Sequence, residues 1–329
     1  MSAAWADAAH RHLTLLVNPA AGNGRSRHHA DVVAQRCRAA GAAVTMRSAD
    51  SPDRLAELAR DAVRDAARAI EQDGEAHAVV AVGGDGTVHL VLQAVGATGV
   101  PMGVVAAGSG DDAARAWGLP RAAPLSAADI LLHGVPRAYD LPSARRADGR
   151  PVFFGTVVAT GFDARVSERS LGLSAIPARL RYVAAMLAEL RSFAPVHYRL
   201  TLGDREVELD AMLVAVANSA SYGGGMRICP DAEADDGLLD VLVLDPLRTA
   251  ELLRVFPRVY AGTHVNHPAV SVHRVRRVHI DAGDMLAFAD GEPLARLPLE
   301  VTVHPAGLSV LARPSDAARD GQVPRSDLP

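Results

Sequence analysis

The chain contains no lysine, and all 34 of its basic residues are arginine. This absence excludes three kinds of chemistry that need a lysine ammonium group: a Walker-type phosphate-binding loop, a Schiff base and catalysis by pyridoxal phosphate. Any phosphate group that the protein binds must therefore be held by backbone N–H groups, arginine, hydroxyl groups or a metal ion.

Cysteines and long apolar runs are also scarce. The two cysteines, Cys37 and Cys229, show neither a disulfide framework nor a metal-binding spacing. No apolar run reaches the roughly 18 residues of a membrane span, and residues 1–11 lack the apolar core of a signal peptide. We therefore expect a cytoplasmic protein. Because a net charge of −4 provides no basic field, we expect no nucleic-acid partner.

The composition that remains is globular, with 329 residues of which 49% are hydrophobic and 22% charged. In residues 1–134, short apolar strands alternate with amphipathic helices, which predicts an α/β domain with a parallel sheet. Residues 135–313 show strand-like runs separated by hairpin turns, and predict an antiparallel β-sandwich interrupted by helices at 177–191 and 249–260. The polar residues 314–329 are predicted to be a disordered tail.

Three glycine-rich loops, at residues 18–24, 83–87 and 106–112, each follow a predicted strand and should converge at one edge of the parallel sheet. In the second loop, Gly83-Gly84-Asp85-Gly86-Thr87 joins a buried strand to a helix, as in a phosphate cradle. Asp85 fits such a cradle if it accepts a hydrogen bond from a nucleoside or holds Mg²⁺. The alternative is an ordinary turn with Asp85 as the helix cap.

Two acidic segments of the second domain are further candidates. Residues 231–237 combine carboxylates with a loop glycine, which is typical of a Mg²⁺ or Ca²⁺ site but also of a solvated acidic loop. Asp290-Gly291-Glu292 lies in a predicted hairpin turn, where a carboxylate could accept a proton or simply belong to the turn. The 13 histidines show no ligand-like spacing.

Six segments together resemble one family in their order along residues 13–311. They are Asn18-Pro19-x-x-Gly22, Gly83-Gly84-Asp85-Gly86-Thr87, Gly108-Ser109-Gly110-Asp111-Asp112, Gly161-Phe162-Asp163, Pro230-Asp231-Ala232-x-x-Asp235-Asp236-Gly237 and Asp290-Gly291-Glu292. The chain resembles the soluble diacylglycerol kinases and related lipid kinases. That resemblance implies a nucleotide-binding α/β domain, a β-sandwich domain and an active site in the cleft between them. It also implies transfer of the γ-phosphate of ATP to the hydroxyl of diacylglycerol or a related lipid alcohol, giving phosphatidic acid.

The resemblance assigns roles to matching residues. It makes Glu292 the general base, with Asp85 and Asp290 as further catalytic residues, and places Asp112 and Asp140 in a network around a catalytic Mg²⁺. It implies a structural Mg²⁺ held by the Asp236 carboxylate and the carbonyl groups of Glu233 and Leu238. The ATP site would comprise Asn18, Pro19, Gly22, Gly83, Gly84, Asp85, Gly86, Thr87, Gly108, Ser109 and Asp112.

The sequence departs from the family pattern at two places, where Asp111 replaces an asparagine and His89-Leu90 replaces an Asn-Glu pair. These departures leave open a nucleotide-sensing protein without turnover. An enzyme similar to NAD kinase is a second alternative, since it shares the Gly-Gly-Asp-Gly loop, but its downstream Asn-Glu pair is matched here by Asn218-Ser219.

The expected partners are a lipid substrate and the inner face of a membrane. The segment at residues 177–191 is predicted to be a basic amphipathic helix, which either touches a membrane peripherally or covers the sandwich. A homodimer is compatible with the sequence.

Overall fold

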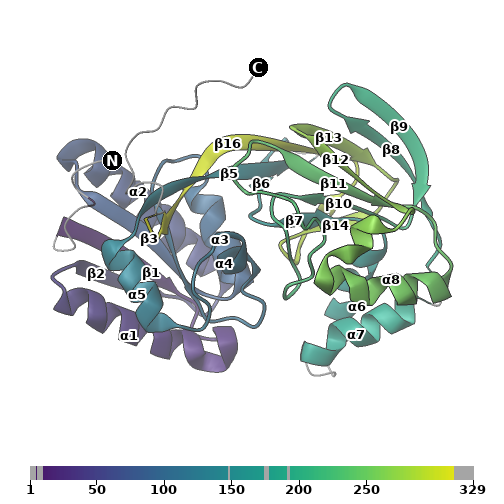
Figure 1. Cartoon of the computed structure of the whole chain (residues 1–329). Helices are drawn as coiled ribbons and strands as arrows, with labels where there is room; N and C mark the ends of the chain where they lie inside the picture. The colour runs from purple at the N-terminus through teal and green to yellow at the C-terminus, as the bar shows by residue number, and fades with distance from the viewer. Residues whose placement is uncertain (1–4, 6–9, 147–148, 174–177, 191–192, 315–329) are drawn as a thin grey trace, which may run out of the picture.

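The computed structural model describes residues 5, 10–146, 149–173, 178–190 and 193–314, with the backbone alone for 178–183. Two lobes lie side by side in Figure 1, and strands β5 (Val135–Arg145) and β16 (Leu299–Ala312) run across the top of the view from one lobe to the other. The predicted tail lies, apart from residue 314, outside the described residues.

The N-terminal lobe is the predicted α/β domain, with a parallel sheet in the order β2-β1-β3-β4. Strands β1, β3 and β4 are continuously or largely buried because helices cover the sheet, whereas the edge strand β2 has no fully buried residue. The strands are β1 (Arg11–Val17), β2 (Ala43–Ser48), β3 (Ala76–Gly83) and β4 (Met102–Ala106). The helices are η3 (Ala21–Gly24), α1 (Arg25–Ala39), α2 (Pro52–Asp73), α3 (Asp85–Val95), α4 (Asp112–Ala116) and α5 (Pro124–His133).

The C-terminal lobe confirms the predicted antiparallel sandwich. A six-stranded antiparallel sheet, β12-β11-β10-β7-β14-β15, packs on strands β16, β13, β8 and β9 of the larger sheet, with an apolar core between them. The strands not yet given are β6 (Pro151–Phe153), β7 (Val157–Ala159), β8 (Val196–Leu202), β9 (Arg205–Ala211), β10 (Leu213–Ala217), β11 (Leu239–Leu244), β12 (Val270–Val275), β13 (Arg277–Asp281), β14 (Leu286–Ala289) and β15 (Glu292–Arg296).

Helices α6 (Phe162–Leu171), α7 (Ala178–Glu189) and α8 (Thr249–Ala261) lie together at the lower side of this lobe in Figure 1, and η4 (Thr263–Asn266) follows α8. Within the described part of the chain, no helix has the length and apolar character needed to cross a membrane. Residues 177 and 191, which the sequence placed at the ends of the α7 helix, are outside the described residues.

Strand β16 joins the two lobes into one hydrogen-bonded sheet. Its first half pairs with β13 in the sandwich, and its far end reaches the parallel sheet, where Val310 is in register with Met102 of β4. Leu308, Val310 and Leu311 are accordingly buried in the N-terminal core. The last strand of the second predicted domain therefore completes the core of the first.

Some local predictions were wrong. The sequence pattern predicts one strand at 270–280, but the structure has two there, because the chain crosses at Arg276 from the six-stranded sheet to the larger one. Helix α6 was not predicted. The sequence pattern also predicts Ser26 and Ser51 as the N-caps of two helices. Ser26 instead lies inside α1, and its hydroxyl donates to the Asn18 carbonyl. Ser51 does cap α2, accepting from the Arg54 N–H at 3.3 Å.

Candidate active site

The three glycine-rich loops converge as predicted at the carboxyl ends of β1, β3 and β4. The Asn18 N–H donates to the Val82 carbonyl at 3.2 Å, and the Ala107 N–H donates to the Gly83 carbonyl at 2.8 Å. Each loop is thus tied by its backbone to the neighbouring strand end, which holds the row of backbone groups rigidly.

Glycine is required where these loops touch. Gly22 has φ +62°, and a Cβ on it would lie 1.9 Å from the Ala107 carbonyl oxygen. Gly84 and Gly108 face each other so closely that a Cβ on Gly108 would lie 2.8 Å from the Gly84 Cα. Such contacts leave no room for side chains, so the backbone itself forms the floor of the site.

Arg25 closes the first loop onto the third. Its Nε donates to the Gly22 carbonyl at 3.0 Å and its Nη2 to the Gly108 carbonyl at 3.1 Å. The Asn18 side chain stabilises the first loop from within, since its Oδ1 accepts from the Ala20 N–H at 3.1 Å. In a chain without lysine, Arg25 places a permanent cation at these loops, a role that sequence reasoning had not assigned.

A cavity of about 1070 Å³ opens above the loops. That volume is ample for a nucleotide, because ligand pockets generally measure ~300–1000 Å³. Its lining includes the predicted ATP-site residues Asn18, Gly22, Gly84, Asp85, Gly86, Thr87, Gly108 and Ser109, together with Arg25, Asp50, His89 and Glu292. Pro19, Gly83 and Asp112, also predicted there, do not line it.

Asp85 begins helix α3 and holds the start of α4. Its Oδ1 accepts from the N–H groups of Asp112 at 2.6 Å and Ala113 at 3.3 Å. Burial and the nearby carboxylate of Asp112 raise the pKa of Asp85 to about 6, and Asp111 adds to the shift. The Asp112 carboxylate accepts from Arg115 and, at 2.8 Å, from the Gly224 N–H of the other lobe.

The departure at Asp111 has a structural explanation. Asp111 adopts φ +50°, and its Oδ1 accepts from the Gly108 N–H at 2.8 Å, so the carboxylate holds the third loop in place. The Thr87 hydroxyl, expected to donate to phosphate, is buried against Gly83 and has no hydrogen-bond partner among the described residues. Its contact with phosphate stays a prediction.

Asp290 is buried and saturated with donors. Its Oδ1 accepts from the Thr156 N–H at 2.8 Å and hydroxyl at 2.6 Å, and its Oδ2 accepts from the Gly155 N–H at 2.9 Å. His89 Nδ1 lies 3.0 Å from the same Oδ2. Burial opposes ionisation, but these bonds, that of His89 foremost, hold the pKa of Asp290 below its usual value. Asp290 is therefore an anchor for its turn.

His89 is the partner from the other lobe. Burial alone would lower the pKa of its imidazole, but the hydrogen bond and charge of Asp290, with a smaller effect of Glu292, raise it. The sequence identified His89 only as a departure from the family pattern. In the fold it links helix α3 to the β14–β15 turn, and so holds the two lobes in register at the cleft.

Glu292 is exposed and projects from the start of β15 toward the first turn of α3. A Cβ on Gly86 would lie 3.0 Å from its Oε1, so the carboxylate reaches the edge of the large cavity. The anchored Asp290 fixes the turn that carries it.

A second cavity, of about 550 Å³, lies between the lobes on the other side of Asp85. Its apolar lining comes from α3, α4, α6 and the loop at 222–226, with Asp112, Asp163 and Asp290 among its polar groups. Asp85, His89 and Ser109 line both cavities. A group bound in one cavity and a group bound in the other would meet at Asp85.

The acidic loop at 231–238 lies apart from both cavities. The Asp236 carboxylate accepts from the Leu238 N–H at 2.9 Å and pairs with Arg274, which also lies 3.7 Å from Asp240. Glu233 is exposed. Because Arg274 already neutralises the carboxylate that a cation would need, the loop as folded does not fit the structural Mg²⁺ that the resemblance implied.

Asp140, expected near the catalytic metal, instead braces this loop. Its Oδ2 accepts from the Gly237 N–H at 2.6 Å and its Oδ1 from the Ala306 N–H at 3.0 Å. The buried carboxylate therefore ties β5 to the acidic loop and to the bend of β16, and it lines neither cavity.

The Arg274 pair can be tested by melting. In the absence of nucleotide we expect the wild-type melting temperature to be the same with Mg²⁺ and with chelator. Arg274→Ala should lower it by roughly 2–4 °C, the scale for losing about 1 kcal/mol from a half-exposed pair, and should make it respond to Mg²⁺. Arg276→Ala, an exposed neighbour, is the control. A wild-type melting temperature that falls with chelator would restore the metal assignment.

Comparison with known proteins defines the family. Residues 12–144 match the model of the diacylglycerol kinase catalytic domain, and residues 156–312 match that of the YegS C-terminal NAD kinase beta sandwich-like domain. A diacylglycerol kinase of Mycobacterium tuberculosis (strain ATCC 25618 / H37Rv) is 37% identical over 91% of this chain and 94% of its own. One of Bacillus subtilis (strain 168) is 28% identical over 60% of this chain and 65% of its own.

The fold is shared with a solved structure. A crystal structure from Bacillus anthracis str. Sterne, named for a diacylglycerol kinase, has a TM-score of 0.72 at 18% identity and covers 93% of this chain and 96% of that one. The chain thus has the two-lobed fold of that structure. The chain belongs to the diacylglycerol kinase family of lipid kinases.

Proposed function

We propose that the protein transfers the γ-phosphate of ATP to the hydroxyl of a lipid alcohol, with diacylglycerol as the acceptor and phosphatidic acid as the product. The observation that carries the proposal is the pair of cavities that share Asp85. The larger cavity has backbone groups and Arg25 in its lining and suits a nucleotide. The smaller cavity has apolar walls between the lobes and suits the glycerol end of a lipid.

In this proposal each residue has a distinct task. Backbone N–H groups of the glycine-rich loops and Arg25 bind the phosphate chain. Glu292 accepts the proton of the attacking hydroxyl, because it is an accessible carboxylate that lines the larger cavity and directly follows Asp290 and Gly291, which line the smaller one. Asp290 and His89 position Glu292 by fixing its turn against α3.

The catalytic site fits a magnesium ion. A Cβ on Gly110 would lie 2.8 Å from Asp85 Oδ2 and 3.3 Å from Asp112 Oδ2, so two carboxylate oxygens face one small space. Oxygen ligands of this kind are those that Mg²⁺ prefers. When bound there, Mg²⁺ would offset the negative charge of the phosphates.

A transfer assay tests the function. The protein is incubated with labelled ATP, Mg²⁺ and one acceptor in each reaction. The acceptors are micellar diacylglycerol, micellar monoacylglycerol, micellar sphingosine and dissolved NAD. We expect the fastest incorporation of label in the reaction with diacylglycerol, as phosphatidic acid. Label in NAD would favour the alternative related to NAD kinase, and no label in any acceptor, with ATP binding intact, would favour a nucleotide sensor.

A lipid acceptor also requires contact with a membrane, and helices α6 and α7 are suited to it. Leu171, at the end of α6, is 61% exposed and lines the smaller cavity, and Leu187 of α7 is 52% exposed. Exposed Arg165 and Arg169 lie on α6 as well, paired with Glu189. We propose that this end of the sandwich lobe docks peripherally on an anionic bilayer.

Leu171→Glu with Leu187→Glu should weaken binding to diacylglycerol-containing vesicles by about 10²-fold or more, because inserting each leucine contributes roughly 1.5–3 kcal/mol. Activity on a monomeric short-chain diacylglycerol should persist. Leu125→Glu is the matched control, since Leu125 is 59% exposed on α5 of the other lobe. Unchanged vesicle sedimentation of the double variant would exclude this docking face.

A further inference from the structure

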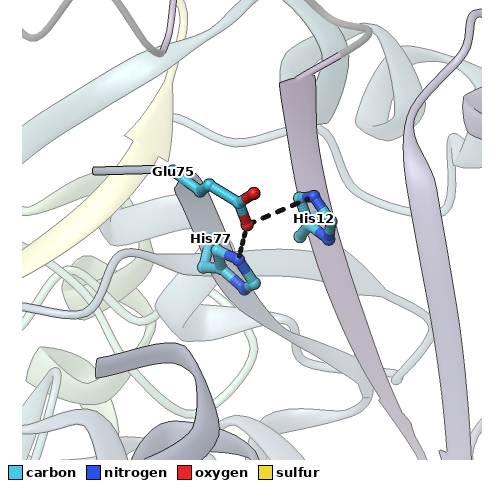
Figure 2. Close-up of side chains that lie close together, drawn as sticks. All are labelled: His12, Glu75 and His77. Atoms are coloured by element: carbon cyan, nitrogen blue, oxygen red, sulfur yellow. Dashed lines mark hydrogen bonds and ion pairs between the residues drawn. The ribbon is translucent and has the colours of Figure 1, made fainter. Parts of the chain in front are cut away.

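A group of potential metal ligands lies at the amino ends of the parallel strands, opposite to the end that carries the three glycine-rich loops. His12 of β1 and His77 of β3 are in register on adjacent parallel strands, so their side chains leave the sheet on the same face. Glu75 precedes His77 by two residues and shares that face. Figure 2 shows both imidazoles turned toward the Glu75 carboxylate.

The distances suit a small cation. Glu75 Oε2 lies 2.9 Å from His77 Nε2 and 3.5 Å from His12 Nε2, and one ligand atom from each residue lies within 4.8 Å of the others. Around tetrahedral Zn²⁺, with bonds of about 2.0–2.1 Å, ligand atoms are separated by about 3.4 Å. The two Glu75 contacts bracket that value, and the two imidazole nitrogens lie within 4.8 Å of each other.

The two imidazole rings are stacked, with centroids 4.4 Å apart and planes 12° from parallel. Because the lone pair of each ring nitrogen lies in its ring plane, two nearly parallel rings cannot both point at one ion, and binding would turn at least one imidazole out of the stack. A bound ion would then take the place of the proton between Glu75 and the imidazoles and would give all three side chains one common partner.

We propose that His12, Glu75 and His77 form a binding site for a divalent transition-metal ion, with Zn²⁺ as the ion that the donor set fits best. Two imidazoles and one carboxylate are a zinc donor set that leaves a coordination position open, and they discriminate against Mg²⁺, which prefers oxygen ligands. The side chains of His12 and Glu75 are 42% and 44% exposed, so water can fill the open position.

This site is separate from the catalytic one. The nucleotide loops follow the carboxyl end of β1, whereas His12 lies near its start, about 20 Å away at the rise of a β-strand. A bound ion would connect His12 near the start of β1 to Glu75 and His77 at the start of β3. It would therefore stabilise the parallel sheet by binding the native state alone.

The experiment uses the full chain, stripped with chelator and titrated with Zn²⁺ by calorimetry in the presence of excess Mg²⁺, and with Co²⁺ to read the visible spectrum of a tetrahedral ion. We expect one saturable site that weakens as pH falls through the histidine range near ~6.5, and a higher melting temperature with Zn²⁺. His12→Ala and His77→Ala should each weaken binding at least tenfold, and Glu75→Gln should weaken it less.

His197→Ala is the matched control, because His197 forms an exposed pair with Asp210 at 3.0 Å without a second histidine. Kinase activity measured in parallel reports that each variant is folded, since none of these residues lines either cavity. Wild-type protein without a saturable site, or binding that survives in both His12→Ala and His77→Ala, would overturn the proposal.

Discussion

Replacing Glu292 by glutamine should lower kcat by about 10²-fold or more, the usual scale for losing a general base. The change keeps the size of the side chain and removes its charge and basicity. Because a base acts in the transition state, KM and the affinity for ATP should change little. Steady-state kinetics on diacylglycerol micelles and calorimetry with ATP measure the two quantities separately.

Two further variants serve as a control and as a test of how Glu292 is positioned. Glu206→Gln, an exposed glutamate on β9 far from either cavity, should retain full activity. Asp290→Asn removes the anionic partner of His89 and should lower both kcat and thermal stability, since it loosens the turn that carries Glu292. If the folded Glu292→Gln enzyme keeps most of its turnover, the base lies elsewhere, and Asp112 and Asp163, which line the smaller cavity, are the next candidates.

Asp85→Ala should have the largest effect, with turnover reduced by about 10²–10³-fold or more, as when a key electrostatic group is removed. It should also weaken ATP binding sharply. The variant loses a charge at the junction of the two cavities and leaves two N–H groups at the start of α4 without their acceptor, which costs roughly 1–3 kcal/mol for each buried group.

Asp85→Asn separates these two causes, because its amide oxygen still accepts from Asp112 and Ala113 while the charge is gone. We expect it to fold like the wild type and still to lack most of the turnover. Asp50→Asn, which neutralises an exposed carboxylate in the lining of the same cavity, is the control and should be nearly as active as the wild type. Calorimetry that finds unchanged ATP affinity in folded Asp85→Ala would remove Asp85 from the nucleotide site.

Much of the architecture was predictable from the sequence because the signals are local. Buried strands such as β3 appear as continuous apolar runs, and glycines directly after them indicate turns where backbone meets ligand. The rule that parallel strands present their carboxyl ends at one edge was enough to predict that the loops at Asn18, Gly83 and Gly108 meet. The proposed roles of Asp85 and Glu292 follow from the same reasoning and the family resemblance, and remain to be tested.

The individual contacts of the site were not predictable in this way. Asp290 was expected to be catalytic, but it is surrounded by donors from a segment 134 residues away and by His89, 201 residues away. Arg274 pairs with Asp236 across 38 residues and takes the place expected for a cation. Neither periodicity nor composition states which distant charged side chain a carboxylate will meet.

The sequence by itself therefore determined most of the strands and helices, the two-lobed class and the positions of the three glycine-rich loops, since apolar periodicity and turn residues act within a few residues. Tertiary structure alone decided three features. Strand β16 completes the N-terminal core, His89 of α3 contacts the turn that carries Glu292 in the other lobe, and His12 and His77 face one carboxylate. These features depend on strand register and on the packing of one lobe against the other, which arise only when segments remote in the chain are brought together.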